Sequence, residues 1–441
     1  MKNRILSPAA GPTSLPPGGP GRPQYNPRPA RRLPAWRSLV VPSRPPLPRF
    51  RCKAWAAVGS VLVELPWVMS DLSVSLQALE RSRSQLPVSS YFDTRLFERE
   101  QARIFQPFPR YLGHELAVPQ TGDYQALAQE GDGRALVRTP RGVELVSNVC
   151  RHRQAVMLRG RGHTGQHIVC PLHRWTYSVQ GELVGAPHFA QDPCLNLRNY
   201  PVQQWNGLVF EHATGQRHLP TELRGLAAAA DLDFSGYQFH SAFVHDCAYN
   251  WKTFIEVYLE DYHVGPFHPG LGQFVECEDL NWEFGAHHSV QTVGVRSALE
   301  RPGSKVYERW HEAVLRFRGG EAPAHGAIWL TLYPTVMVEW YPHVLVVSSL
   351  HPMGPQRTLN LVEYFYPEEI VAFEPEFIAA QQQAYAETMA EDDEIALRMD
   401  AGRQALMARG DDETGPYQSP MEDGMQHFHE WYRRQMQDDL A

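Results

Sequence analysis

The chain has 441 residues, enough for two or three domains with a large hydrophobic core. Its formal net charge of −8 divides into +10 for residues 1–68 and −18 for the remainder, so we expect no nucleic-acid partner for the main body of the chain. The apolar run at residues 54–63 is too short to span a membrane, and we expect no membrane partner either.

Residues 1–68 differ in composition from everything that follows. They hold eleven Lys or Arg, one Glu and fourteen of the thirty-six prolines. Such a segment buries too little apolar surface to offset its chain entropy, so we expect disorder. Organellar transit peptides are also rich in Arg, but the prolines are incompatible with their amphipathic helix. Met69 precedes a helical pattern of Leu72, Leu76 and Leu79, which favours a natural start at Met69, with the extension foreign to the natural protein and a helical segment over residues 69–107.

Residues 108–215 are predicted to form a small antiparallel β domain. Two alternating segments, residues 135–138 and 143–146, flank Thr139-Pro-Arg-Gly142 and predict a β-hairpin. Further short strands are predicted at residues 167–169 and 207–210, and residues 177–183 are expected to turn at their Gln-Gly pair. The first hairpin and the strand at 167–169 each lead into a loop that contains a cysteine.

These two loops carry the clearest motif of the chain. The first contains Cys150-Arg-His152 and the second, seventeen residues later, Cys170-Pro-Leu-His173. A structural zinc site with two Cys and two His usually segregates them as Cys-x₂₋₄-Cys and His-x₃₋₅-His, whereas here each pair is mixed. Mixed pairs suit a [2Fe–2S] cluster in which Cys150 and Cys170 hold one iron and His152 and His173 the other. Neutral imidazoles lower the negative charge of such a cluster, so it accepts an electron more readily.

This stretch resembles the Rieske domain of the ring-hydroxylating oxygenases. Respiratory-complex Rieske proteins carry an additional Cys in each loop, where this chain has Ala155 and Leu172, so the oxygenase type is favoured. The oxygenases usually have Gly after the second ligand His, and Arg174 departs from that pattern. Trp175 and Tyr177 match the family and are expected to pack against the cluster loop.

A second group of candidate ligands begins at Asn250, a favourable helix N-cap. The apolar residues that follow have helical spacing: Trp251, Phe254, Ile255, Tyr258, Leu259 and Tyr262. Another face of the predicted helix carries Lys252, Glu256, Glu260 and His263. His268 follows beyond a Gly-Pro pair, so a turn must return it toward His263. A mononuclear Fe(II) oxygenase site needs two His and one carboxylate on one side of the metal. By itself the segment is interpreted equally well as a solvated helix with a loop histidine, and the preceding Rieske-like motif favours the iron site.

From Asn250 to Pro269 the sequence is similar to the iron-binding helix of the same oxygenase family. The resemblance implies that His263 and His268 are iron ligands and that Glu260 connects them to the Rieske His of a neighbouring subunit. Many aromatic-ring dioxygenases have Asp at this place. Glu resembles the subset that oxidises quaternary ammonium compounds such as carnitine or choline. Val257 stands where many relatives have an Asn near the iron.

The third iron ligand is expected from the C-terminal part of the chain. Residues 282–366 alternate β-branched and aromatic residues and predict long strands, whereas residues 373–407 become helical and acidic. The family places its carboxylate ligand just before the apolar part of such a helix, which implies Asp393, with Asp392 as the next choice. As a bare charge run this segment would be a solvated helix face. Ser419-Pro-Met-Glu422 predicts a capping box that opens a last helix.

The chain is thus expected to be α+β, with an N-terminal all-β Rieske [2Fe–2S] domain followed, over residues 216–441, by a catalytic domain of the helix-grip type, an antiparallel sheet with a long helix. The resemblance implies a homotrimeric terminal oxygenase that uses O₂ at a mononuclear Fe(II) to hydroxylate or demethylate a small organic substrate, either an aromatic compound or a quaternary amine. A separate NAD(P)H-dependent reductase is expected, because no flavin or nicotinamide fingerprint occurs. Cys52, Cys194, Cys247 and Cys277 have no regular spacing and indicate free thiols in a reducing cytoplasm.

Two alternatives stay open. An electron-transfer Rieske protein without oxygenase activity would need none of His263, His268 or Asp393. A degenerate oxygenase scaffold with only a binding role is left open by Val257 and Arg174.

Overall fold

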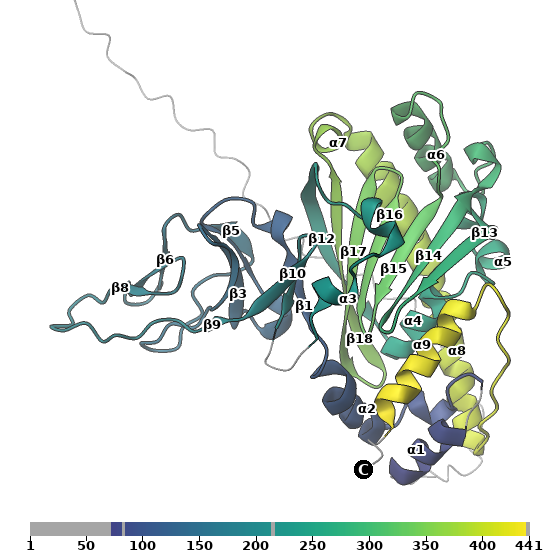
Figure 1. Ribbon diagram of the computed structural model, residues 1–441, viewed down its shortest axis with the longest axis horizontal. Coiled ribbons are helices and arrows are strands. Elements are labelled where there is room, and N and C mark those ends of the chain that lie inside the picture. Colours follow the sequence, from purple (N-terminus) through teal and green to yellow (C-terminus); the bar gives the residue numbers. More distant parts are fainter. Residues whose placement is uncertain (1–71, 82–83, 213–216, 438–441) are drawn as a thin grey trace, which may run out of the picture. The chain divides into compact units, whose positions relative to one another are not determined.

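The computed structural model describes residues 72–81, 84–212 and 217–437 (Figure 1). The predicted extension over residues 1–68 and the predicted start at Met69 lie outside these residues. These described residues belong to one compact unit. In the part of the chain described, no helix is both long and apolar enough to cross a membrane.

The first domain is a set of short antiparallel strands, as the sequence predicts. Its strands are β1 (Tyr111–His114), β2 (Asp123–Ala126), β3 (Arg134–Thr139), β4 (Gly142–Ser147), β5 (Arg161–His163), β6 (His167–Val169), β7 (Thr176–Ser178), β8 (Leu183–Gly185), β9 (Asn199–Tyr200), β10 (Val202–Trp205) and β11 (Leu208–Glu211). They form sheets of order β5-β2-β3-β4-β9, β6-β7-β8 and β1-β11-β10. The predicted hairpin is confirmed, because β3 pairs with β4 across the turn that ends at Gly142.

A seven-stranded antiparallel sheet of order β12-β18-β17-β16-β15-β14-β13 forms the centre of the second domain. Its strands are β12 (Tyr237–Cys247), β13 (Val275–Phe284), β14 (His288–Val295), β15 (Ala327–Leu332), β16 (Val336–Tyr341), β17 (Val344–Gly354) and β18 (Arg357–Pro367). The helices of this domain are α3 (Leu219–Glu222), α4 (Trp251–Tyr258), α5 (Val264–Phe267), α6 (Lys305–Phe317), α7 (Glu368–Phe373), α8 (Pro375–Arg409) and α9 (Asp423–Met436). The predicted α+β class, with a long helix beside the sheet, is confirmed (Figure 1).

The two faces of this sheet belong to different hydrophobic cores. Successive side chains of a strand point to opposite faces, so neighbours in the sequence separate. One face, with Trp329 and Val346, packs against residues of α6 and the long helix α8. The other face, with Leu330 and Val347, packs against β11 and the α3 region. The sheet therefore separates a helix-covered side from a side that faces the first domain.

The N-terminal helices α1 (Leu72–Arg81) and α2 (Thr94–Glu100) share a third core with α4 and α9. Asp93 caps α2 by accepting hydrogen bonds from the backbone N–H groups of Arg95 and Leu96. Leu79 and Leu96 are buried in this core together with aromatic residues of α4 and α9. The beginning and the end of the described chain are thus held together around α4, which Asn250 caps as predicted.

Two predicted helix boundaries are wrong. The helix that begins after Asn250 ends at Tyr258, well before His263, and Tyr262 is exposed. His263 and His268 instead cap the two ends of the short helix α5, and their ring centroids are 4.9 Å apart. The last helix begins at Asp423 rather than after Ser419, and no capping box forms there.

Candidate active site

The two cysteine loops of the first domain are built alike. In each, the backbone N–H four positions after the cysteine donates to the cysteine carbonyl, Gln154 to Cys150 at 3.0 Å and Arg174 to Cys170 at 3.2 Å. The N–H of each cysteine donates to the carbonyl of the fifth residue after it. The distance is 2.9 Å from Cys150 to Ala155 and 2.8 Å from Cys170 to Trp175. Gln154 and Arg174 have φ of 58° and 60°, in the left-handed region that favours glycine. The loop geometry thus gives a physical reason for the Gly that the family resemblance implies at the position of Arg174.

The four predicted cluster ligands lie together on these loops. The rings of His152 and His173 are 4.6 Å apart between centroids, while Cys150 and Cys170 are each 1% exposed. His152 Nδ1 is buried without a hydrogen-bond partner among the described residues. A buried imidazole nitrogen of this kind is satisfied by coordination to a metal, so the donor set fits a [2Fe–2S] cluster.

Trp175 and Tyr177 support the loops, as their match to the family predicts. The Trp175 ring stacks on the His152 ring at a centroid distance of 5.0 Å and an interplanar angle of 6°. The Tyr177 hydroxyl accepts a hydrogen bond from the Arg151 N–H at 3.1 Å and lies 3.6 Å from Cys150 Sγ. These contacts fix an imidazole plane and place a hydroxyl at a thiolate, an interaction that tunes the potential of such clusters.

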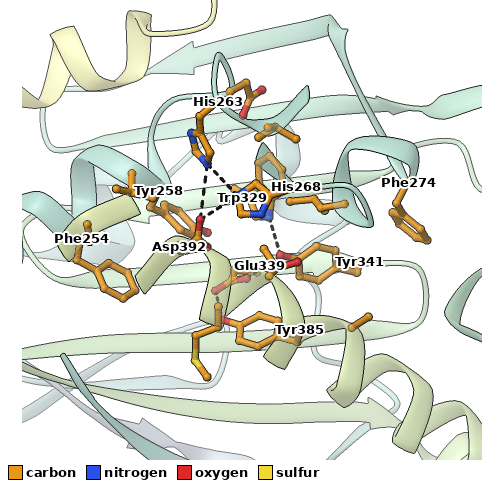
Figure 2. A pocket seen from close by; sticks show the side chains of 18 of the residues that line it. Phe254, Tyr258, His263, His268, Phe274, Trp329, Glu339, Tyr341, Tyr385 and Asp392 are labelled. Atoms are coloured by element: carbon orange, nitrogen blue, oxygen red, sulfur yellow. Dashed lines mark hydrogen bonds and ion pairs between the residues drawn. The ribbon is translucent and has the colours of Figure 1, made fainter. Parts of the chain in front are cut away.

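In the second domain, His263, His268 and Asp392 converge on one point (Figure 2). Nε2 of His263 and Nε2 of His268 are 3.0 Å apart, and Asp392 Oδ1 lies 3.0 Å from the second and 3.6 Å from the first. Ligand atoms on adjacent positions of a metal, with bonds of about 2.1 Å at right angles, lie about 3 Å apart. Two imidazoles and one carboxylate on one side of a metal are the donor set of non-haem Fe(II) oxygenases.

The Nδ1 atom of each of the two imidazoles is hydrogen-bonded to a further carboxylate. His263 Nδ1 hydrogen-bonds to Glu260, which also accepts from the His263 backbone N–H at 3.0 Å. His268 Nδ1 lies 2.7 Å from Oε2 of Glu391, a residue that we did not predict. Burial lowers the pKa of His263, but the hydrogen bonds with Asp392 and Glu260 outweigh it and raise this pKa to about 10. Such second partners orient both Nε2 atoms toward the shared point, and the acidic surroundings favour a bound cation.

Asp393 does not join this group, and the choice of Asp393 over Asp392 is corrected. Asp393 instead accepts from the Tyr249 hydroxyl at 2.7 Å and pairs with His245 at 2.8 Å. Consecutive residues of a helix point about 100° apart, so only one of the two aspartates faces the histidines. Leu397, in the apolar part of the helix that follows these acidic residues, is 47% exposed and does not mark the buried face of α8.

A cavity adjoins the three converging side chains. The α8 residues that line it follow helical spacing: Gln381, Ala384, Tyr385, Thr388, Met389, Asp392 and Ala396. The other walls are mainly aromatic: Tyr249, Phe254, Tyr258, Phe274, Tyr307, Trp310, Trp329 and Tyr341. Val257 also lines the cavity and contributes an apolar surface where many relatives have Asn. Glu339 on β16 is a buried carboxylate in this lining (Figure 2).

Lys252 and Glu256, which the sequence predicts on the same helix face as Glu260 and His263, do not take part in the iron site. Lys252 and Glu256 are 0% and 1% exposed, so this face is not solvated. Lys252 Nζ lies 2.5 Å from Glu100, and Glu256 pairs with Arg403 at 2.5 Å and His429 at 2.8 Å. They form a buried ionic network that anchors α4 to α2, α8 and α9.

Comparison with known proteins identifies both domains. Residues 110–203 match the model of the Rieske [2Fe-2S] domain, and residues 234–438 match that of the ring hydroxylating alpha subunit catalytic domain. The chain is 64% identical over 368 residues to the putrescine 2-hydroxylase of Ralstonia nicotianae, covering 83% of this chain and 100% of that protein. It is 60% identical to the putrescine 2-hydroxylase of Bordetella bronchiseptica, covering 84% of this chain and 88% of the relative.

The resemblance to quaternary ammonium oxygenases is confirmed at greater distance. The carnitine monooxygenase oxygenase subunit of Escherichia coli is 27% identical over 65% of this chain and 76% of its own length. The solved structure of the quaternary ammonium Rieske monooxygenase CntA with L-carnitine shares the fold, with a TM-score of 0.64 at 19% identity over 82% of this chain and 99% of that one. The catalytic-domain match, together with the close relatives, rules out the alternative of an electron-transfer protein. The chain therefore belongs to the ring-hydroxylating alpha subunits, terminal oxygenases that contain a Rieske [2Fe–2S] cluster and a mononuclear iron.

Proposed function

We propose that this enzyme hydroxylates putrescine, or a closely related short aliphatic diamine, at the second carbon. The observation that carries the proposal is the 64% identity over the full length of a putrescine 2-hydroxylase. The overall change inserts one oxygen atom of O₂ into a C–H bond and reduces the other to water, consuming two electrons and two protons. Quaternary amines and aromatic compounds, the substrate classes that the sequence motifs implied, become comparison substrates.

In this proposal His263, His268 and Asp392 hold the iron. Their donor atoms are spaced for adjacent positions on one metal. Fe(II) held by these residues would supply the activation of O₂. Glu260 and Glu391 keep the two imidazoles in place through their Nδ1 atoms. The aromatic cavity holds the substrate carbon near the metal and limits the access of water.

Cys150, His152, Cys170 and His173 hold the cluster in this proposal, and His173, which is exposed, is the exit for electrons. A separate NAD(P)H-dependent reductase supplies them. In a head-to-tail homotrimer, His173 of one subunit would contact Glu260 of the next, and this contact would carry the electron toward His263. The Glu260 side chain is 15% exposed, and it is already hydrogen-bonded to His263.

Product analysis tests the proposed reaction. Putrescine, carnitine or benzoate would be added to the purified enzyme with a surrogate reductase and NADH under ¹⁸O₂. Mass spectrometry would identify the products and their ¹⁸O content. We expect 2-hydroxyputrescine with one ¹⁸O atom, and none from an Asp392→Ala variant that keeps its cluster. Oxidation of carnitine or benzoate, with putrescine untouched while the cluster is reduced, would contradict the proposal.

A further inference from the structure

Two buried acidic side chains line the cavity without serving the metal site, Asp261 and Glu339, and of these Glu339 is fixed by tyrosine hydroxyls. Glu339 lies on β16, where its register partner on β15 is Trp329, and its side chain points to the helix-covered face of the sheet. It is 1% exposed and lines the cavity beside Asp392. The hydroxyls of Tyr385 and Tyr341 each donate to one of its carboxylate oxygens at 3.0 Å. The carboxylate is therefore held in a fixed position by two neutral groups.

Within the described ranges, Glu339 has no Lys, Arg or His partner within 4.0 Å, in contrast to the buried Glu256, which is paired with Arg403 and His429. Burial raises the pKa of Glu339 to about 7, and the charge of Asp392 adds to the rise. Hydrogen bonds from tyrosines do not neutralise a buried negative charge. A ligand with a positive charge would complete the pair.

The walls around this carboxylate also suit a cation. Trp329 Nε1 donates to the Tyr341 hydroxyl at 3.0 Å, which orients both rings beside Glu339 (Figure 2). The Trp329 ring centroid lies 6.3 Å from that of Tyr341 and 6.4 Å from that of Tyr258. The Tyr258 hydroxyl is buried in this wall and has no hydrogen-bond partner among the described residues. Aromatic faces attract cations, most strongly where water is excluded.

We infer that Glu339, within the ring of Tyr258, Trp329, Tyr341 and Tyr385, is the subsite that binds the primary ammonium group of an alkylamine substrate. The ammonium has three N–H donors, which suit a carboxylate oxygen and nearby hydroxyls. The inference rests on the proposed function in taking the substrate to be an amine, and it assigns one end of that amine to a place beside the iron ligands. Neutral or aromatic hydrocarbon substrates would leave the carboxylate unpaired in the cavity.

The same sheet offers a matched control. Glu363 on β18 is also 1% exposed, accepts a hydrogen bond from a tyrosine (Tyr111, 2.6 Å), and has its pKa raised to about 7 by burial. Its register partner is Val347, on the opposite face of the sheet from Glu339, and it does not line the cavity. Glu363→Gln therefore removes a comparable buried carboxyl without touching the cavity.

The test compares Glu339→Gln with Glu363→Gln in the iron-loaded holoenzyme. Calorimetry without O₂ would measure the binding of putrescine, 1-aminobutane and the neutral 1-butanol, and turnover assays would give KM and kcat for putrescine. We expect Glu339→Gln to weaken the binding of both amines, and to raise KM, by at least about 30-fold, which is the lower range for removing one partner of a buried charge pair. Binding of 1-butanol, the cluster spectrum and the iron content should not change, and Glu363→Gln should behave like the wild type.

The outcomes separate the two ideas. If the wild type binds amines in a Glu339-dependent manner but does not hydroxylate putrescine, the subsite stands and the proposed reaction fails. If putrescine is hydroxylated and Glu339→Gln leaves both Kd and KM unchanged, the subsite is wrong and the reaction stands. Should Glu339→Gln fail to fold, the wild type alone decides, since 1-butanol binding as tightly as 1-aminobutane would overturn the inference.

Discussion

At the scale of single residues, Arg174 shows how the cluster loops accept a departure from the family. It occupies a left-handed position that the backbone closure of the loop imposes, and Gln154 does the same in the other loop. A residue with a Cβ atom pays about 1–2 kcal/mol in this conformation, so the ligands keep their place at a modest cost in stability.

We therefore predict that Arg174→Gly is neutral or stabilises the cluster domain by up to about 1 kcal/mol, because relief of strain exceeds the added freedom of the unfolded chain. Arg174→Val should destabilise it by about 1–3 kcal/mol, since a β-branched residue fits this region worst. The denaturant concentration at which the cluster absorption disappears measures both effects. Loss of the cluster in Arg174→Gly would show that the guanidinium, rather than the backbone, supports the loop.

Asp392 and Asp393 offer a second comparison at this scale. Asp392→Ala should abolish binding of the mononuclear iron while the cluster spectrum remains, because the carboxylate that faces His263 and His268 is gone. Asp393→Ala should keep the iron and lose about 1–3 kcal/mol of stability, because His245 and Tyr249 lose their partner. Iron analysis and thermal unfolding of the two proteins decide the matter, and the reverse pattern would restore Asp393 as the ligand.

How far the sequence predicts the site depends on how local each feature is. Cys150 to His173 and the pair His263 and His268 are short motifs, and the structure brings the members of each together. Glu391 meets its histidine across more than a hundred residues, so no spacing rule reveals it. Glu339 left a weaker signal, a lone carboxylate in the otherwise apolar strand β16, which is unusual for a buried strand.

At the scale of secondary-structure elements, α4 is fixed by charges that a sequence pattern suggests are solvated. Lys252 and Glu256 are buried and paired with residues from α2, α8 and α9. The apolar period of the helix was predicted correctly, but its polar face packs against other helices instead of water. Where α4 ends was also not predictable from periodicity, since the apolar spacing continues to the exposed Tyr262.

The buried network predicts an acid sensitivity of this helix assembly. Burial opposes the ionisation of Glu256, but Arg403 and His429 outweigh it and lower the pKa of Glu256 from 4.5 to about 2. Ionised Glu256 therefore stabilises the fold fully above a pH of about 4.5, and this stabilisation, about 3 kcal/mol, is lost as the pH falls toward 2. Glu256→Gln should lower stability near neutral pH by about 3–5 kcal/mol and flatten its decline in acid.

Denaturant unfolding at a series of pH values between about 2 and 7 checks this expectation. Glu430→Gln, an exposed position on α9, is the control and should stay within about 0.5 kcal/mol of the wild type. An unchanged acid profile in Glu256→Gln would assign the sensitivity to other groups.

At the scale of the whole molecule, the proposed passage of electrons between subunits is open to a complementation test. Cys150→Ala removes the cluster of a chain, and Glu260→Gln replaces the carboxylate on His263 by a neutral amide of the same shape. Loss of such a partner of a metal ligand typically costs about 10–100-fold in affinity or activity. We expect each variant alone to be nearly inactive, with Glu260→Gln still reducing its cluster and binding iron.

Trimers assembled from a mixture of the two variants would contain some interfaces that join an intact cluster to an intact Glu260. Activity should partly return in these mixed trimers, as measured by hydroxylated product per iron-loaded subunit. If mixed trimers are isolated, fully loaded and still inactive, electrons do not take the route between subunits.

The alternation of side chains in the large sheet has one more consequence. Glu339 faces the cavity only because β15 and β16 pair with Trp329 opposite it, and its neighbours Val338 and Trp340 point the other way. The length of the turn at residues 333–335 sets that pairing, and a slip of one residue exchanges the two faces of a strand. Insertion or deletion of a single residue in this turn would thus turn Glu339 away from the cavity and toward the first domain, with every lining residue still present in the sequence.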